Sequence, residues 1–226
     1  MKTLYVIPAR GGSKGIPHKN IKHLNGKPLI YYSIDVARQL TTDENICVST
    51  DDDEIIKAVD DYGLNVPFKR PDHLATDSAT TNDVIIHALD YYESKGVHYD
   101  VVILLQPTSP LRKATQVKEA IDLYNNQLDM IVSVKESKSA TVICSENEDG
   151  YLEFSLNKSG SRRQNISSYY EYNGAIYIIN TESLKINNIS GLSKKKKYVM
   201  DEISSVDVDT PLDWFLVESI INQQKV

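Results

Sequence analysis

The chain has 226 residues, of which 41% are hydrophobic and 25% charged, so it can bury one sizeable core, and we expect a single domain over residues 1–226. Its net charge of −6 argues against a nonspecific nucleic-acid binder, because such a protein needs a broad basic surface. The apolar run after Lys2 is too short for a signal peptide, and the sequence has no apolar segment of membrane length. We therefore expect a cytoplasmic protein whose partners include neither nucleic acid nor a membrane.

A short apolar strand is predicted at 3–7, and it leads directly into a glycine-rich basic loop at 8–20. Glycines let the backbone approach a ligand closely, so that consecutive N–H groups can converge on phosphate oxygens. Arginine and lysine side chains in the same loop can hold and neutralise a polyphosphate. The alternative is an ordinary surface turn with solvated charges. The residues concerned are Arg10, Gly11, Gly12, Ser13, Lys14, Gly15, Lys19 and Asn20.

Strand-like and helix-like segments alternate through the first half of the chain. This alternation predicts an α/β fold with a mostly parallel sheet, in which ligands bind at the carboxyl ends of the strands, where the basic loop would lie. The glycine spacing fits neither the Walker pattern nor the dinucleotide fingerprint, so it favours another kind of nucleoside triphosphate site. We predict strands at 3–7, 45–49, 100–105 and 130–134, and helices at 29–40, 53–62, 83–94 and 114–125.

Several polar residues stand just before predicted helices and have two interpretations. The aspartates at 51–53 suggest a metal cluster, but they precede a helix whose positive end favours them. We interpret Asp53 as a helix cap and Asp51 as a group that could support a metal ligand. Thr80 or Thr81 could cap the third helix, or take part in binding.

After residue 134 the pattern changes, and the segment 135–172 reads as an inserted β arm around a turn-rich stretch at 146–150. The lysines at 194–197 are interpreted as a solvated loop. We predict short strands at 141–144, 151–155, 175–179 and 204–206, and a closing helix from 211 to about 222.

Asp207 and Asp209 stand two apart at the end of the expected strand at 204–206, so their side chains would share one face. Mg²⁺ is commonly bound by one or two carboxylates together with substrate phosphates, and this pair could hold it. The alternative is that Asp209, with Thr210 and Pro211, caps the last helix.

A set of motifs runs in order along the chain and resembles the cytidylyltransferases that activate acylneuraminates and related nonulosonic acids to CMP-sugars. The resemblance implies a Rossmann-like sheet of the nucleotide-diphospho-sugar transferase type. It also implies a homodimer, in which the arm at 135–172 reaches over the partner's active site. Beyond the loop at 8–20, the motifs are Ser-Thr-Asp at 49–51, Arg-Pro at 70–71, Leu-Ala-Thr-Asp at 74–77, Leu-Leu-Gln-Pro-Thr-Ser-Pro-Leu-Arg at 104–112, Arg-Gln at 163–164, Asn-Gly-Ala-Ile-Tyr at 173–177 and Asp-Val-Asp-Thr at 207–210.

The resemblance also implies roles for individual residues, with CTP, an acidic nine-carbon sugar and Mg²⁺ as the bound species. Arg70 could instead be part of a plain surface turn before Pro71, and Arg163 an exposed residue of a polar loop. The implied sets are Arg10, Lys14, Lys19 and Asp209 for catalysis; Arg10, Gly11, Gly12, Ser13, Asn20, Arg70 and Thr81 for the nucleotide; Gln106, Arg163, Gln164, Asn173 and Tyr177 for the sugar; and Asp207 and Asp209 for the metal.

The implied reaction is attack of the anomeric hydroxyl of the sugar acid on the α-phosphate of CTP, with release of pyrophosphate. Ser167 and Glu171 depart from the family pattern on the sugar side. The substrate-contacting lysine in the arm of some family members has no clear counterpart near Lys138, so the acyl sugar stays unassigned. Two alternatives are a 3-deoxy-manno-octulosonate cytidylyltransferase and a non-catalytic nucleotide-binding homologue.

Overall fold

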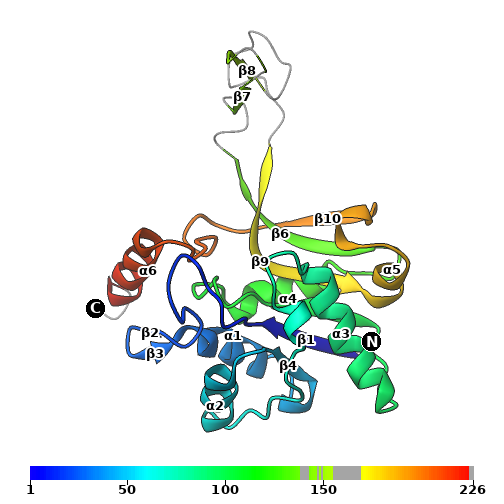
Figure 1. Ribbon diagram of the computed structural model, residues 1–226. Helices are drawn as coiled ribbons and strands as arrows, with labels where there is room; N and C mark the ends of the chain where they lie inside the picture. The colour runs from blue at the N-terminus through cyan, green and yellow to red at the C-terminus, as the bar shows by residue number, and fades with distance from the viewer. Residues whose placement is uncertain (138–142, 147, 149, 155–168, 224–226) are drawn as a thin grey trace.

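The computed structural model describes residues 1–137, 143–146, 148, 150–154 and 169–223. Its centre is a six-stranded sheet in the order β10-β6-β9-β5-β1-β4 (Figure 1). β1 pairs in parallel with β4 and β5, β10 pairs in parallel with β6, and β9 runs antiparallel between β5 and β6. The strands are β1 (Thr3–Pro8), β4 (Ile46–Ser49), β5 (Val101–Leu104), β6 (Met130–Glu136), β9 (Tyr170–Asn180) and β10 (Lys195–Val199). The predicted α/β fold with a mostly parallel sheet is confirmed.

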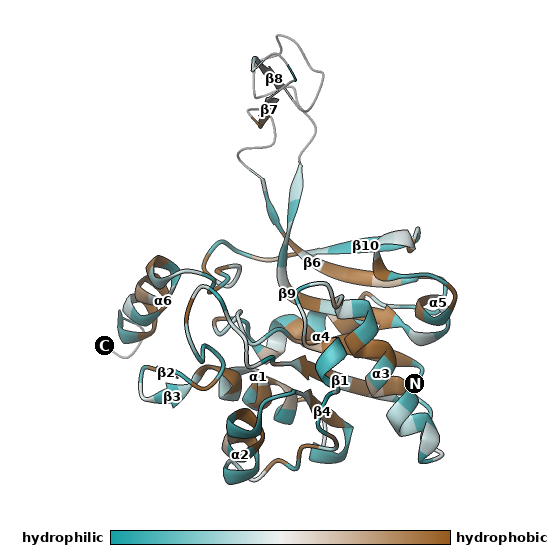
Figure 2. Ribbon diagram, in the orientation of Figure 1, coloured by the Kyte–Doolittle hydropathy of each residue, from teal (hydrophilic) through white to brown (hydrophobic). Residues whose placement is uncertain are grey.

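Helices cover both faces of this sheet, and Figure 2 shows the apolar strands enclosed between them. Alternate residues of β1 divide between two buried clusters, as the two-residue strand period requires. Tyr5 and Ile7 join the cluster under α1, α2 and α4, whereas Leu4 and Val6 join the cluster under α3 and α5. The helices are α1 (Leu29–Arg38), α2 (Asp53–Asp61), α3 (Thr81–Ser94), α4 (Ala114–Asp122), α5 (Thr181–Ile186) and α6 (Pro211–Gln223), with 3₁₀ turns η1 (Asp43–Asn45), η2 (Asp72–Leu74) and η4 (Ile189–Gly191).

Within the described residues, no helix is both long and apolar enough to cross a membrane. The helices that were predicted from periodicity occur with their ends shifted by a few residues, as expected for elements defined by their buried face. A small hairpin, β2 (His23–Leu24) and β3 (Lys27–Pro28), connects the basic loop to α1.

The arm is built on the two strands that leave the sheet together. β6 and β9 stay paired up to Glu136 and Tyr170, and the hairpin of β7 (Cys144–Glu146) and β8 (Leu152–Phe154) lies beyond them (Figure 1). The register of the ladder shifts between Val132 and Val134, opposite Gly174, whose φ of +75° suits glycine. The bulge therefore lies near the root of the arm. Of the strands predicted at 141–144 and 151–155, residues 141, 142 and 155 lie outside the described residues.

Two expectations for the second half are wrong. Residues 204–206 are not a strand, because the backbone turns there and these residues pair with no strand of the sheet. The strand lies earlier, in the lysine run, where β10 pairs with β6 from Lys195 to Val199. An edge strand is paired on one side only, so its lysine side chains reach solvent while its backbone extends the sheet.

Candidate active site

The basic loop and the segment around Asp207 and Asp209 are in direct contact at the carboxyl edge of the sheet. Lys19 Nζ donates to Val208 O at 2.7 Å and to Asp209 Oδ1 at 2.9 Å, and the lysine side chain is only 10% exposed. Gly15 packs so closely that a Cβ at this position would lie 2.2 Å from Asp209 O. The two segments, predicted separately from the sequence, therefore form one unit.

Two other cations of the loop share a single carboxylate. Arg10 Nη1 lies 3.0 Å from Asp77 Oδ1, and Lys14 Nζ lies 2.6 Å from Asp77 Oδ2. Lys14 and then Arg10 lower the pKa of the Asp77 carboxyl by hydrogen bonding to its charged form. The Asp77 carboxylate is thus held between two cations of the basic loop, which is the arrangement that a phosphate group would require.

Asp51 anchors the loop from below. Its Oδ1 accepts from Gly11 N at 3.3 Å and from Arg70 Nη2 at 3.1 Å, and the Arg70 residue is 4% exposed. Asn20, also buried, donates from Nδ2 to Arg10 O at 3.0 Å. Arg70 is therefore a buried part of the site, and the interpretation of it as a plain surface turn is wrong.

The caps of the nearby helices differ in part from expectation. Asp52, rather than Asp53, caps α2, because its Oδ1 accepts from Glu54 N and Ile55 N. The chain before α2 is extended at Asp52, so its side chain faces the free N–H groups, while Asp53 lies one residue inside the helix and pairs with Lys69 at 2.7 Å.

Thr80, one of the two threonines considered, caps α3 in a reciprocal arrangement with Asp83. Thr81 is the first residue of α3 and lines a cavity of about 360 Å³ with Arg10, Arg70 and Gln106. This cavity begins where β1 ends and continues over the Leu-Ala-Thr-Asp segment. It therefore extends from Arg10 of the basic loop to the start of α3.

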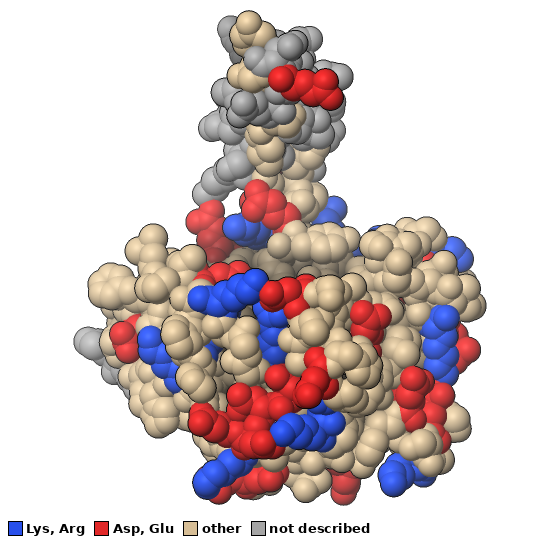
Figure 3. All heavy atoms as spheres, viewed as in Figure 1, with Lys and Arg blue, Asp and Glu red and all other residues tan. Residues whose placement is uncertain are grey.

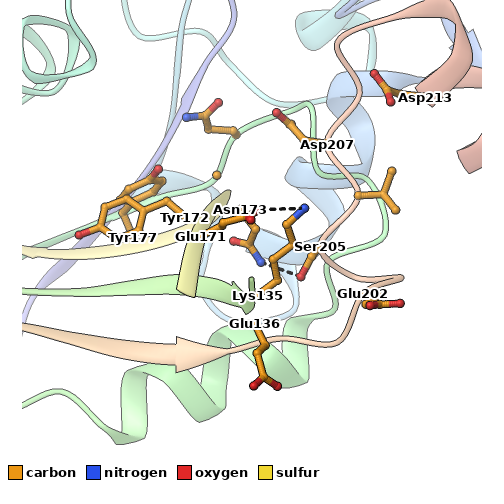
Figure 4. A pocket seen from close by; sticks show the side chains of 13 residues that line it. Lys135, Glu136, Glu171, Tyr172, Asn173, Tyr177, Glu202, Ser205, Asp207 and Asp213 are labelled. Carbon is orange, nitrogen blue, oxygen red and sulfur yellow. Dashed lines mark hydrogen bonds and ion pairs between the residues drawn. The ribbon is translucent and has the colours of Figure 1, made fainter. Parts of the chain in front are cut away.

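A second cavity, of about 610 Å³, opens beneath the arm and shares Gln106 with the first. Figure 4 shows Tyr172 and Tyr177 on one side of it and Asp207 on the other. A third cavity, of about 550 Å³, continues from it past Gln106 and both tyrosines to Ile189. Burial raises the pKa of the Tyr177 hydroxyl, so it stays protonated at neutral pH. Gln106 and Tyr177, both expected on the sugar side, therefore border connected hollows.

Asn173 lines the second cavity, but its amide is committed within the protein. Asn173 Oδ1 accepts from Ser133 Oγ at 2.5 Å and from Ala175 N at 3.2 Å. Asn173 Nδ2 donates to Ser205 Oγ at 2.9 Å, as Figure 4 also shows. The structure thus gives this side chain a framework role beside the cavity.

The Asp207 and Asp209 carboxylates lie close together, although the strand that was expected to align them is absent. Burial, together with the nearby Asp209, raises the pKa of Asp207, which identifies the pair as interacting charges. Asp207 Oδ1 is buried without a hydrogen-bond partner among the described residues, whereas Asp209 is 69% exposed. A hard cation that takes oxygen ligands fits such a donor set. Asp209 is not needed as a cap, because Thr210 and Asp213 cap α6 with reciprocal hydrogen bonds.

Acidic and basic side chains lie beside one another over the viewed face of the molecule (Figure 3). Among the charged residues that line the cavity beneath the arm, acidic ones outnumber basic ones, and Lys135 there is paired with Glu171 at 3.3 Å. Arg163 and Gln164, expected to bind the sugar, lie outside the described residues. Sequence reasoning gave no role to Asp77 or to Arg112, although both stand in motifs that it singled out.

Comparisons with known proteins identify the family. The cytidylyltransferase family model matches residues 4–213, and the chain belongs to this family, so it is a nucleotidyltransferase. A CMP-N,N′-diacetyllegionaminic acid synthase from Legionella pneumophila is 35% identical over 99% of both chains. An N-acylneuraminate cytidylyltransferase from Streptococcus agalactiae is 36% identical over 96% of this chain, which spans only 52% of that protein.

A pseudaminic acid cytidylyltransferase from Campylobacter jejuni is 32% identical over 94% of this chain and 93% of its own length. Among solved structures, a CMP:2-keto-3-deoxy-manno-octonic acid synthetase in complex with CTP superposes with a TM-score of 0.73. It covers 99% of this chain and 100% of its own at 20% identity, a likeness that shows the fold alone.

Gly15→Ala should reduce both thermal stability and turnover, because the new Cβ would push Asp209 and the adjoining carboxylates away from the loop. Gly12→Ala is the matched control, since a Cβ at Gly12 meets nothing within 4 Å. The measurement is the melting temperature of each variant without ligand, compared with that of the wild-type protein. We expect a fall of several degrees for Gly15→Ala alone, about the size expected for a destabilisation of 1–2 kcal/mol. Equal melting temperatures would show that the contact has no structural weight.

Asp77→Asn should tighten CTP binding several-fold at low salt, because the carboxylate that competes with phosphate for Arg10 and Lys14 is removed. Asp72→Asn is the control, since it removes the same charge from the same segment without touching either cation. Calorimetric titration at low and high ionic strength measures the effect. Weaker binding by Asp77→Asn would show that this carboxylate contacts the nucleotide instead of competing with it.

Proposed function

We propose that this protein transfers CMP from CTP to the anomeric hydroxyl of a nonulosonic acid and releases pyrophosphate. The observation that carries the proposal is the Lys19 contact, which holds the cationic loop against the Asp207 and Asp209 pair between two cavities. Family membership supports the nucleotidyl transfer, and the names of the relatives support a nonulosonic acid as acceptor. The proposal thus joins a site geometry to a substrate class.

The cavity bordered by Arg10, Arg70 and Thr81 would take the cytidine, with the triphosphate on the basic loop. Arg10 and Lys14 would exchange Asp77 for phosphate oxygens and stabilise the charge that develops during displacement at phosphorus. The acceptor oxygen forms a bond to the α-phosphorus, the bond to the β-phosphate oxygen breaks, and the hydroxyl proton passes to a base or to water. Positioning supplies much of such a reaction.

Asp207 and Asp209 would hold Mg²⁺, which when bound supplies charge neutralisation at the phosphates and acidifies oxygen ligands. Lys19 holds Asp209 beside the loop, because its side chain is buried and its ammonium is also bonded to Val208 O. The role of this lysine is accordingly to hold the carboxylate side of the site as well as to add positive charge.

The cavity beneath the arm would take the acceptor, with its exocyclic acyl groups toward the more apolar hollow at Tyr172, Tyr177 and Ile189. Its acidic lining does not favour a sugar carboxylate, because Lys135 is already paired with Glu171. We therefore infer a homodimer in which the arm of a second copy, carrying Arg163 and Gln164, supplies positive charge. The described hairpin of β7 and β8 lies away from the core of its own chain, which supports this arrangement (Figure 1).

A substrate panel tests the proposed acceptor. Pyrophosphate release from CTP and Mg²⁺ should occur with one or more of N-acetylneuraminate, legionaminate and pseudaminate, and not with 3-deoxy-manno-octulosonate. Activity with the octulosonate alone would replace the proposed acceptor by the shorter sugar acid. Silence with all four, combined with intact CTP binding, would favour another acceptor or a non-catalytic protein.

Asp209→Asn should lower turnover by orders of magnitude while the fold remains intact, because the asparagine oxygen can still accept from the buried Lys19 Nζ but the carboxylate charge is lost. The loss should be accompanied by weaker Mg²⁺ binding in a titration without nucleotide. Asp122→Asn, which neutralises an exposed carboxylate on α4, is the control. Wild-type turnover in Asp209→Asn would refute the metal assignment.

A further inference from the structure

Arg112 is a buried cation with no carboxylate partner among the described residues. It is 3% exposed, and it lies between β5 and α4 under the floor of the candidate site. Moving a guanidinium out of water costs several kcal/mol unless other groups compensate, and an apolar side chain would fill the same space without that cost. Burial lowers the pKa of Arg112 to about 9, so it is still charged at neutral pH. The chain thus keeps a charge where packing alone does not require one.

The guanidinium is used to bind main-chain oxygen atoms. Arg112 Nη1 donates to Gln106 O at 3.1 Å and to Ala175 O at 2.7 Å, and Nη2 donates to Ser33 Oγ at 2.6 Å. Ser33 Oγ in turn donates to Gln106 O at 3.2 Å. A planar guanidinium holds its donors in a fixed fork that can span acceptors on different elements, whereas a lysine ammonium is a single point charge on a flexible stem.

Gln106 O therefore accepts from both side chains, Arg112 Nη1 and Ser33 Oγ, and in addition from Ser109 N at 3.4 Å. This fixes the plane of the peptide that follows Gln106, at the residue that borders all three cavities of the carboxyl edge. The bond to Ala175 O fixes the β9 bulge in the same way, two residues before Tyr177. One buried charge thus sets the relative position of the two main-chain segments that form the floor of the site.

We propose that Arg112 is a positioning residue for the transfer reaction, and that it acts by holding the Gln106 main chain so that the Gln106 amide faces the acceptor. The kinetic part of this inference rests on the proposed function. Arg112 lines none of these three cavities and is only 3% exposed, so its effect must pass through Gln106 and the β9 segment, which it contacts. Ser33, which completes the same triangle of hydrogen bonds, acts in the same direction with a smaller effect.

A double-mutant cycle tests the inference. In the wild-type background Arg112→Lys should lower kcat/KM for the acceptor by about tenfold or more, and raise its KM. In a Gln106→Ala background the same change should cost less than about twofold, because the group that Arg112 positions is gone. Equal losses in both backgrounds, or no loss in either, would overturn the proposal.

Arg38→Lys is the matched control. Arg38 also binds main-chain carbonyl oxygens, those of Tyr62 and Gly63, but away from the cavities. It should leave kcat/KM unchanged. If Arg112→Lys does not fold, Ser33→Ala takes its place in the same cycle, since it removes the Ser33 bond to Gln106 O and retains the arginine.

A second readout needs no sugar substrate. In protein labelled with ¹⁵N-glutamine, the side-chain amide signal of Gln106 is identified by its loss in Gln106→Ala. Arg112→Lys and Ser33→Ala should shift or broaden that signal, whereas Arg38→Lys should not. An unchanged signal refutes the positioning role even in an active enzyme. A changed signal in a protein that turns over no nonulosonic acid refutes the proposed acceptor and leaves the positioning role supported.

Discussion

The contact of Lys19 with Val208 and Asp209 is the interaction on which the candidate site depends. It joins residues that lie 189 and 190 positions apart, and so brings the first loop of the chain against its last loop. A buried ammonium without such partners would be strongly destabilising, so the contact strongly favours one arrangement. Apolar packing of Ile16 against Val208 and Trp214 strengthens this contact. The first turn of α6 is thereby also held to the basic loop. The basic loop and the Asp207 and Asp209 pair consequently lie at a defined spacing in the folded chain.

Charged pairs at this edge of the sheet divide into two kinds by burial. Arg70 with Asp51 and Lys19 with Asp209 each involve a buried cation, so breaking them would leave a charge out of water. Arg10 and Lys14 with Asp77 are exposed, and exposed pairs contribute little stability. In the proposed reaction a triphosphate would therefore replace Asp77 at small cost, while the buried pairs of the loop stay intact. The buried pairs therefore hold the shape of the candidate site, whereas the exposed pairs can be exchanged for pairs with a bound anion.

Periodicity in the sequence was sufficient for most of the fold but not for the contacts that make the site. Buried strands and amphipathic helices have local patterns, and these predicted the α/β alternation. The lysines of β10 carry no such pattern, because an edge strand is defined by its neighbour. The helix cap moved from Asp53 to Asp52 because a cap depends on where the backbone turns. The role of Arg112 is visible only when Ser33, Gln106 and Ala175 are seen together, since they lie far apart in the sequence.

The β9 strand links the floor of the site to the arm. Its bulge at Asn173 and Gly174 is fixed from three directions, by Ser133 of β6, by Ser205 of the segment that leads to Asp207, and by Arg112 through Ala175 O. Because interiors are close-packed and transmit displacement, a shift of the arm at its root would move both the cavity wall and the approach to the carboxylate pair. Under the proposed function, Asn173 would therefore serve acceptor recognition through this connection, because its own amide is occupied by protein groups.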